Sequence, residues 1–172
     1  FLVTKVGKEI LAKAENILKG GYFFEATEAL ALSKPLLEKQ VEDDMVRRIK
    51  EVIMMLGKGF SFIGNQYLLS AGDNTYRIDL LFFNRITMSL VAVELKMTEF
   101  KAEYAGKMNL YLKLLDEKVK LEHENSSIGL ILCTDRNDVE VDYILPEVKR
   151  PIGVAELKLS KVLPKELAGK LP

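Results

Sequence analysis

Two stretches of the sequence place charged side chains inside apolar runs. Residues 91–96 read VAVELK, so Glu94 and Lys96 close a hydrophobic run, and Asp79 interrupts another run at residues 78–83, IDLLFF. In an extended strand alternate side chains share a face, so we expect Glu94 and Lys96 to be neighbours on one face. If the two runs pair as a hairpin, Asp79 lies opposite a position close to Glu94. The spacing therefore predicts two carboxylates and one ammonium group at a single point.

The chemistry that suits these groups is hydrolysis of phosphodiester bonds. Two converging carboxylates repel each other and lose hydration, which is costly unless a cation joins them. Mg²⁺ prefers oxygen ligands and commonly takes one or two protein carboxylates, with water and substrate phosphate as its other ligands. Lys96 beside such an ion could orient or deprotonate a water molecule and offset charge on a phosphate. An ion pair on a sheet surface would produce the same pattern, so spacing alone leaves both interpretations open.

A long helix is predicted before these strands. Apolar residues recur at helical spacing over residues 41–56, and the run stops at the Gly-Lys-Gly that follows. Helical patterns also precede it, including one over residues 23–32, so we expect residues 1–40 to form an N-terminal helical arm. Residues 41–172 are then expected to form the nuclease-like domain that carries the charged groups.

After this helix the apolar pattern changes to a period of two. Three strand-like runs separated by polar turns predict an antiparallel meander. The later pattern predicts a helix, a strand buried on both faces, a short helix and a last strand. The expected elements are strands at 60–70, 76–84 and 90–96, a helix at 102–118, a strand at 127–133, a helix at 139–145 and a strand at 152–159. This order is mixed α/β, with a parallel crossover after the meander.

Composition and charge exclude several classes of protein. The chain has 172 residues, which suits one α/β domain with an appended arm. Its 25 basic and 25 acidic residues give no net charge, so any surface that binds phosphate must be local. Cys133 is the only cysteine, so no intramolecular disulfide can form, and no Cys/His cluster is present for zinc. We expect a cytoplasmic protein without a membrane span or a small-molecule cofactor.

Five longer stretches carry a resemblance to a known family. They are GKGFSFIGNQYLL (57–69), RIDLLFFNR (77–85), LVAVELKMTEFKAEYAGKMNLYLKLLD (90–116), HENSSIGLILC (123–133) and PIGVAELKLSKVLPKELAGKLP (151–172). These stretches resemble the nuclease domain of the YhcG-like family, within the PD-(D/E)xK superfamily of restriction-endonuclease-like enzymes. The resemblance covers most of the chain, whereas the arm before residue 40 matches weakly.

This resemblance implies a restriction-endonuclease-like mixed sheet flanked by helices, and a metal-dependent DNA nuclease. It implies that Asp79 and Glu94 bind Mg²⁺ or Mn²⁺, that the backbone carbonyl of Leu95 is a further ligand, and that Lys96 is the catalytic lysine. DNA is the implied partner. Proteins of this superfamily often form homodimers so that two sites address two strands, and the arm could supply that interface or fold back on its own core.

One position departs from the family pattern. The helix before the meander usually supplies a further glutamate in this superfamily, and Arg47 aligns with that position. Asp44 or Glu51 could reach the same region from a neighbouring turn. Alternatively, the Arg47 guanidinium could pair with Asp79 or Glu94, take the place of the cation and weaken Mg²⁺ binding. The second hypothesis is therefore a weak or inactive nuclease that still binds DNA.

Other polar side chains are candidates for contact with nucleic acid. Lys101 and Lys107 belong to the helix that flanks the active site in similar proteins, where a lysine could contact a phosphate. A solvated helix face explains these two lysines equally well. Gln66 and Arg77 lie near the ends of the meander and are lesser candidates for the same role.

Overall fold

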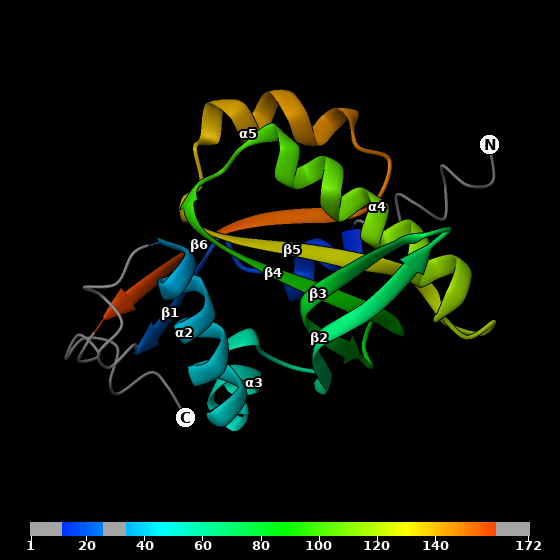
Figure 1. Ribbon diagram of the computed structural model, residues 1–172, viewed down its shortest axis with the longest axis horizontal. Coiled ribbons are helices and arrows are strands. Elements are labelled where there is room, and N and C mark those ends of the chain that lie inside the picture. Colours follow the sequence, from blue (N-terminus) through cyan, green and yellow to red (C-terminus); the bar gives the residue numbers. More distant parts are fainter. Residues whose placement is uncertain (1–11, 26–33, 161–172) are drawn as a thin grey trace.

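The computed structural model describes residues 12–25 and 34–160, which form one six-stranded sheet with helices on both faces (Figure 1). The strands are β1 (Gly21–Glu25), β2 (Phe60–Ala71), β3 (Asn74–Asn84), β4 (Ser89–Glu99), β5 (Asn125–Asp135) and β6 (Ile152–Ser160). The helices are α2 (Lys34–Arg47), α3 (Ile49–Leu56), α4 (Ala102–Lys118), α5 (Asp138–Ile144) and the short 3₁₀ helix η2 (Leu145–Glu147). Within the described residues no helix is long and apolar enough to cross a bilayer.

The strands follow one another across the sheet in the order β1-β6-β5-β4-β3-β2. Strands β2, β3 and β4 are antiparallel, as expected of a meander. Strands β5, β6 and β1 continue from β4 in parallel orientation. Helix α4 connects β4 to β5 and so forms the predicted parallel crossover. The mixed α/β order predicted from residue 57 onward is therefore confirmed.

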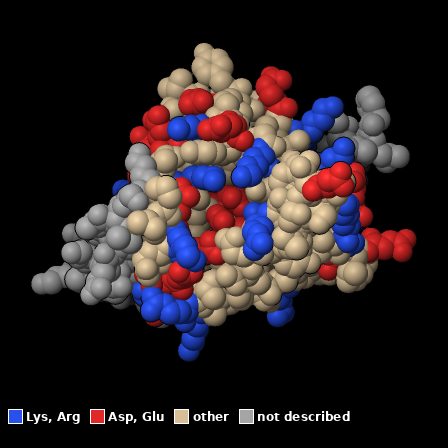
Figure 2. All heavy atoms as spheres, viewed as in Figure 1, with Lys and Arg blue, Asp and Glu red and all other residues tan. Residues whose placement is uncertain are grey.

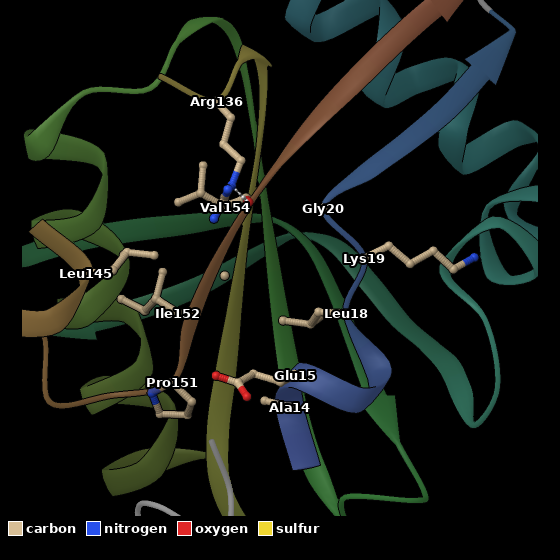
Figure 3. A pocket seen from close by; sticks show the side chains of 11 residues that line it. Ala14, Glu15, Leu18, Lys19, Gly20, Arg136, Leu145, Pro151, Ile152 and Val154 are labelled. Atoms are coloured by element: carbon tan, nitrogen blue, oxygen red, sulfur yellow. Dashed lines mark hydrogen bonds between the residues drawn. The ribbon is translucent and has the colours of Figure 1, made fainter. Parts of the chain in front are cut away.

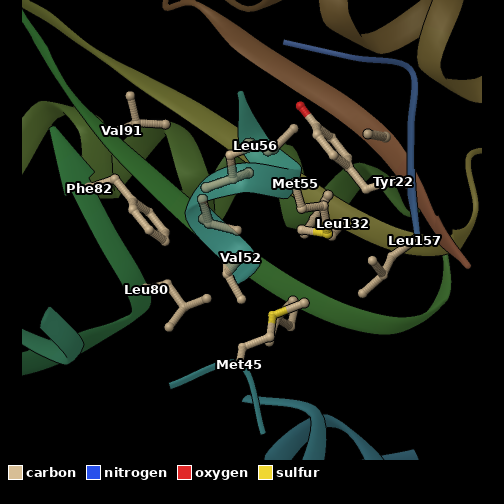
Figure 4. Packing of buried hydrophobic residues seen from close by; sticks show 14 of the residues in the cluster. Tyr22, Met45, Val52, Met55, Leu56, Leu80, Phe82, Val91, Leu132 and Leu157 are labelled. Atoms are coloured by element: carbon tan, nitrogen blue, oxygen red, sulfur yellow. The ribbon is translucent and has the colours of Figure 1, made fainter. Parts of the chain in front are cut away.

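Successive side chains of the central strands point to opposite faces of the sheet, so each face carries its own hydrophobic core. In β4, the side chains of Val91, Val93 and Leu95 pack with α2 and α3 on one face. The side chains of Leu90 and Ala92 pack with α4 and α5 on the other face. Figure 4 shows part of the first core, with the labelled residues Met45, Val52, Leu56, Leu80 and Phe82. Burial on both faces explains why β4 is apolar along most of its length.

Two tight connections set the register of the meander. Gly72 adopts φ of 60° in the turn between β2 and β3, a conformation that glycine takes without strain. Between β3 and β4, Oδ1 of Asn84 accepts hydrogen bonds from the backbone N–H groups of Ile86 and Thr87, at 2.9 and 3.2 Å. The resulting register pairs Asn84 with Ser89 and runs back along both strands. Continued by one position beyond Leu80 and Val93, this register places Asp79 opposite Glu94.

The N-terminal part of the chain differs from the predicted helical arm. Residues 12–17 are helical, but residues 21–25 form strand β1, which pairs with β6. The helical prediction for residues 23–25 was wrong because β1 buries only two large side chains, Tyr22 and Phe24, which is too short a pattern to separate a period of two from a helical one. The rest of that predicted helix, residues 26–32, lies outside the described residues.

The helix expected at residues 41–56 is also placed differently. It begins earlier, at Lys34, and is divided into α2 and α3 at Arg48, which has φ of −111° and ψ of 39°. The expected domain boundary at residue 40 therefore falls inside α2. A division of the chain into an arm and a nuclease domain stays a prediction.

Candidate active site

Asp79 and Glu94 meet where β3 and β4 separate. The ladder between these strands ends at the pair Leu80 and Val93. Beyond it, the backbone N–H of Asp79 donates to Oε1 of Glu94 at 3.0 Å, and the N–H of Leu95 donates to Oδ2 of Asp79 at 2.9 Å. The carboxylates thus accept the hydrogen bonds that a continuing ladder would have made. This exchange brings the two predicted acids together and opens the sheet at that point.

Burial dominates the electrostatics of this acid pair. Glu94 is only 6% exposed, and its burial, followed by the charge of Asp79, raises its pKa from 4.5 to about 8. Burial also raises the pKa of Asp79, against the opposing effects of the Leu95 N–H and the Lys96 charge. Two such acids release their protons readily only when a cation compensates their charge. Their oxygen atoms and this unmet charge fit a hard divalent ion such as Mg²⁺ or Mn²⁺.

Lys96 lies on the same side of the sheet as the acids. Its charge lowers the pKa of both Asp79 and Glu94. Nζ of Lys96 lies 5.4 Å from the centroid of the Tyr104 ring, within the range of a cation–π contact. The Tyr104 hydroxyl is in turn 2.7 Å from Oγ1 of Thr98. An aromatic ring on α4 therefore fixes the position of the lysine.

The candidate nucleic-acid contacts divide into two groups. Lys107 belongs to the acid site, since its charge lowers the pKa of Glu94 and its Nζ lies 5.9 Å from the Tyr111 ring centroid. Lys101 at the start of α4 and Arg77 on β3 are exposed at the surface. Gln66 faces the acids: its Nε2 donates to Oδ1 of Asp79 at 3.3 Å.

Sequence analysis missed a further acid, Glu42 on α2. Glu42 is 8% exposed, and both of its carboxylate oxygens accept hydrogen bonds from Nε2 of Gln66, at 2.9 and 2.7 Å. Its burial raises its pKa, the hydrogen bond from Gln66 opposes that rise, and the charge of Asp79 adds to it. One turn earlier on α2, Oε1 of Glu38 accepts the N–H of Met97 at 2.9 Å. The four-residue spacing of Glu38 and Glu42 was a signal that they share one helix face.

Arg47 lies away from the acids, so the alternative in which it pairs with Asp79 or Glu94 was wrong. Its side chain is 68% exposed and forms an ion pair with Asp44. Arg47 lies five positions after Glu42 on the helix, which turns its side chain about 140° around the helix axis. Asp44 is held by Gln40 and Arg47, so it does not take the place of the expected glutamate.

Glu51, the other alternative, also points elsewhere. It lies on α3, and its Oε2 accepts a hydrogen bond from Nε of Arg48 at 2.7 Å. The acidic residue of α2 that contacts Asp79 through Gln66 is therefore Glu42, five positions before the one that sequence reasoning selected.

A pocket opens over Glu42, Gln66 and Asp79, between α2 and the β2–β3 hairpin. It has a volume of about 290 Å³ and is lined by Pro35, Glu38, Lys39, Glu42, Asp43, Asn65, Gln66 and Asp79. Figure 2 shows acidic side chains within a central hollow of this face, with basic side chains around it. In the described part of the chain, no group of three or more His, Cys, Asp or Glu side chains is arranged to hold a metal ion.

A second pocket, of about 240 Å³, lies near the start of β6 (Figure 3). Its lining is largely apolar, and two of its charged groups, Arg136 and Lys19, already have partners. Nε of Arg136 donates to the carbonyl of Val154 at 2.8 Å, and Nζ of Lys19 points out of the pocket to the carbonyl of Met55 at 2.9 Å. Asp79 lines the first pocket together with Glu42, whereas neither acid lines the second, so the first pocket is the better candidate for catalysis.

Known proteins resemble this chain in sequence. The family described as the YhcG PDDEXK nuclease domain matches residues 15–172. The protein YhcG of Escherichia coli (strain K12) is 35% identical over 144 residues, which is 84% of this chain and 38% of that protein. The chain thus spans well under half of the length of this relative.

Solved structures resemble it in fold. An EndoMS-dsDNA complex superposes with a TM-score of 0.50 at 17% identity, over 77% of this chain and 49% of that one. A repair endonuclease from Pyrococcus abyssi gives a TM-score of 0.46 at 14% identity, over 73% of this chain and 47% of that one. The first likeness supports the restriction-endonuclease-like α/β fold that the sequence implied.

Proposed function

Because the chain belongs to the YhcG PDDEXK nuclease domain family, we propose that it hydrolyses phosphodiester bonds in DNA with the help of a divalent metal ion. The observation that carries this proposal is the buried pair of Asp79 and Glu94 at the point where β3 and β4 separate, with Lys96 beside it. DNA is the proposed partner, in keeping with the nuclease family.

Asp79 and Glu94 would hold Mg²⁺ or Mn²⁺. The carbonyl of Leu95 is suited to be a third ligand, because the N–H and C=O of a strand residue point to the same edge and this N–H donates to Asp79. When bound, the ion would supply positive charge for the phosphate and lower the pKa of a water molecule. The raised pKa of Glu94 favours this arrangement, because a cation is what allows the pair to ionise together at neutral pH.

The remaining residues of the site would act on the water and the DNA. The ammonium group of Lys96, held over the Tyr104 ring, can orient a water molecule and offset negative charge that develops on the phosphate. Lys107, whose charge lowers the pKa of Glu94, is proposed to contact a phosphate next to the scissile one. Lys101 and Arg77 are proposed as more distant contacts with the DNA backbone, because both are exposed.

Nicking of supercoiled plasmid in the presence of Mn²⁺ tests the proposal. The Asp79→Ala and Lys96→Ala variants are expected to lose about 100-fold or more in rate, because each removes a charged group at the reacting phosphate. Circular dichroism of each variant serves as the control for folding. Equal nicking by the wild type and the Asp79→Ala variant would point to a contaminating nuclease and contradict the site.

A further inference from the structure

Gln66 has an unusual backbone conformation for a residue inside a strand. Among the described residues other than glycine, positive φ occurs at Gln66 (47°), Met88 (53°) and Asn137 (50°). Met88 lies in the turn before β4 and Asn137 at the start of α5, where such angles are common. Gln66 lies in the middle of β2. Strain of this kind persists only when the surrounding structure maintains it, and it is found most often at functional sites.

This conformation interrupts the ladder at the position of Asp79. On either side, Asn65 pairs with Leu80 and Tyr67 pairs with Ile78, whereas Gln66 and Asp79 form no such pair. Gln66 instead directs its side-chain amide towards the carboxylates of Glu42 and Asp79. Because the residue is exposed, burial of apolar surface does not compensate the strain.

The amide of Gln66 joins two acids that come from different elements. Its Nε2 donates to both carboxylate oxygens of Glu42, at 2.9 and 2.7 Å, and to Oδ1 of Asp79 at 3.3 Å. The N–H of Leu95 holds the other oxygen of Asp79 at 2.9 Å. Both oxygens of Asp79 are therefore held, one from β4 and the other from β2 through Gln66.

We propose that Gln66 is a positioning residue that fixes the carboxylate of Asp79, and that Glu42 acts on the site through Gln66 by holding its amide. This inference rests on the proposed function. The NH₂ group has two N–H bonds, so one is shared between the two oxygens of Glu42 and turns the group towards the acids, while the other donates to Asp79 and sets the direction of its carboxylate.

A pair of glycine variants separates this role from relief of strain. Gln66→Gly removes the amide and accepts positive φ, while Met88→Gly accepts the same conformation at a turn away from the acids. With Gln66→Gly we expect Mn²⁺ affinity, measured by calorimetry, to fall about 10-fold or more, as for other residues that orient metal ligands. At saturating Mn²⁺ we expect kcat for nicking to fall while the KM for DNA stays the same. Met88→Gly should match the wild type in both measurements.

Crystal structures of the metal-free wild type and the Gln66→Gly and Gln66→Glu variants give a readout that does not depend on activity. The Asp79 carboxylate is expected to rotate about its hydrogen bond to the N–H of Leu95 in both variants, because Oδ1 loses its partner. Gln66→Glu serves if the glycine variant does not fold. An unmoved Asp79 carboxylate, or unchanged Mn²⁺ affinity in Gln66→Gly, would overturn the inference. If the wild type neither binds Mn²⁺ nor nicks DNA, the proposed function fails, and the position of Asp79 alone decides whether Gln66 positions it.

Discussion

The carboxyl group of Glu94 links the chemistry of the site to the stability of the protein. Its pKa is raised to about 8 by burial and by the charge of Asp79, whereas the unfolded chain leaves it near 4.5. Between these two values the folded state binds more protons than the unfolded state. Folding stability must then decrease as pH rises through this window, which is opposite to the usual behaviour of an acid in a salt bridge.

We therefore expect the metal-free protein to lose thermal stability between about pH 5 and pH 8, by at most about 1.4 kcal/mol per pH unit from Glu94. Glu94→Gln should flatten this dependence, because the amide does not titrate. Mn²⁺ should raise the melting temperature of the wild type more at pH 8 than at pH 5. A melting temperature that rises steadily to pH 8 in the wild type without metal would contradict the buried acid pair.

Arg47 is a useful test of the corrected site. Since its guanidinium pairs with Asp44 and not with the acids, Arg47→Glu is expected to leave Mn²⁺ affinity and nicking unchanged. The variant should be less stable by about 1–2 kcal/mol, because Asp44 is buried and would lose its partner and face a like charge. Arg47→Met, which is neutral, separates loss of the pair from repulsion. Gained cleavage in Arg47→Glu would instead support a site silenced by this arginine.

At the scale of elements, the position of α4 depends on a close approach to β5. A Cβ atom on Gly129 would lie 2.6 Å from Cγ and 2.8 Å from Sδ of Met108, so glycine allows the helix to sit directly on the strand. Helix α4 carries Tyr104 and Lys107, which contact or face the acid site. A small shift of α4 would therefore move the side chains that surround Lys96.

Gly129→Ala is expected to destabilise the protein by about 1–3 kcal/mol, because Met108 must move out of a packed core. Gly106 provides the matched control on α4 itself, since its exposed position leaves nothing within 4 Å of an added Cβ atom. Gly106→Ala should stabilise the protein by about 0.5–1 kcal/mol through helix propensity. Urea unfolding followed by circular dichroism measures both changes; equal effects would show that α4 does not sit tightly on β5.

At the scale of the whole molecule, the net charge cannot attract DNA, so any attraction must come from a local group of basic side chains. The net charge is zero, with 25 basic and 25 acidic residues. Figure 2 nevertheless shows basic side chains around a hollow that contains acidic ones. Such an arrangement would attract the phosphate backbone to the rim and still leave the acids available to a metal ion. DNA affinity should therefore depend on a few lysines and arginines of this face.

Lys107→Ala is expected to weaken DNA binding and to reduce the slope of log affinity against log salt concentration by about 1, the change for one lost phosphate contact. Lys50→Ala is the control, because Lys50 is exposed on α3, across the sheet from α4. Fluorescence anisotropy with an uncleaved duplex in Ca²⁺ measures both. If the two variants lose the same slope, the α4 face is not the DNA-binding surface.

The sequence by itself determined the elements from residue 57 onward and the meeting of Asp79 with Glu94. The two-residue period of an extended strand set which side chains of β3 and β4 share a face, and the short polar turn between the strands set their register. Both signals are local, so they can be read without knowledge of distant contacts. The family resemblance came from the same segments, and the match of the family to residues 15–172 confirms it.

Only the tertiary structure decided which distant residues complete the site. Glu42 reaches Asp79 through Gln66, across 24 and 13 residues of sequence, and neither spacing carries a periodic signal. The rotation of α2 about its axis, which turns Glu42 towards the site and Arg47 away from it, depends on how the helix packs against β4. The same holds for β1, a five-residue strand whose identity comes from pairing with β6. Local sequence fixes periodicity, whereas helix rotation and the addition of an edge strand depend on packing between segments far apart in the chain.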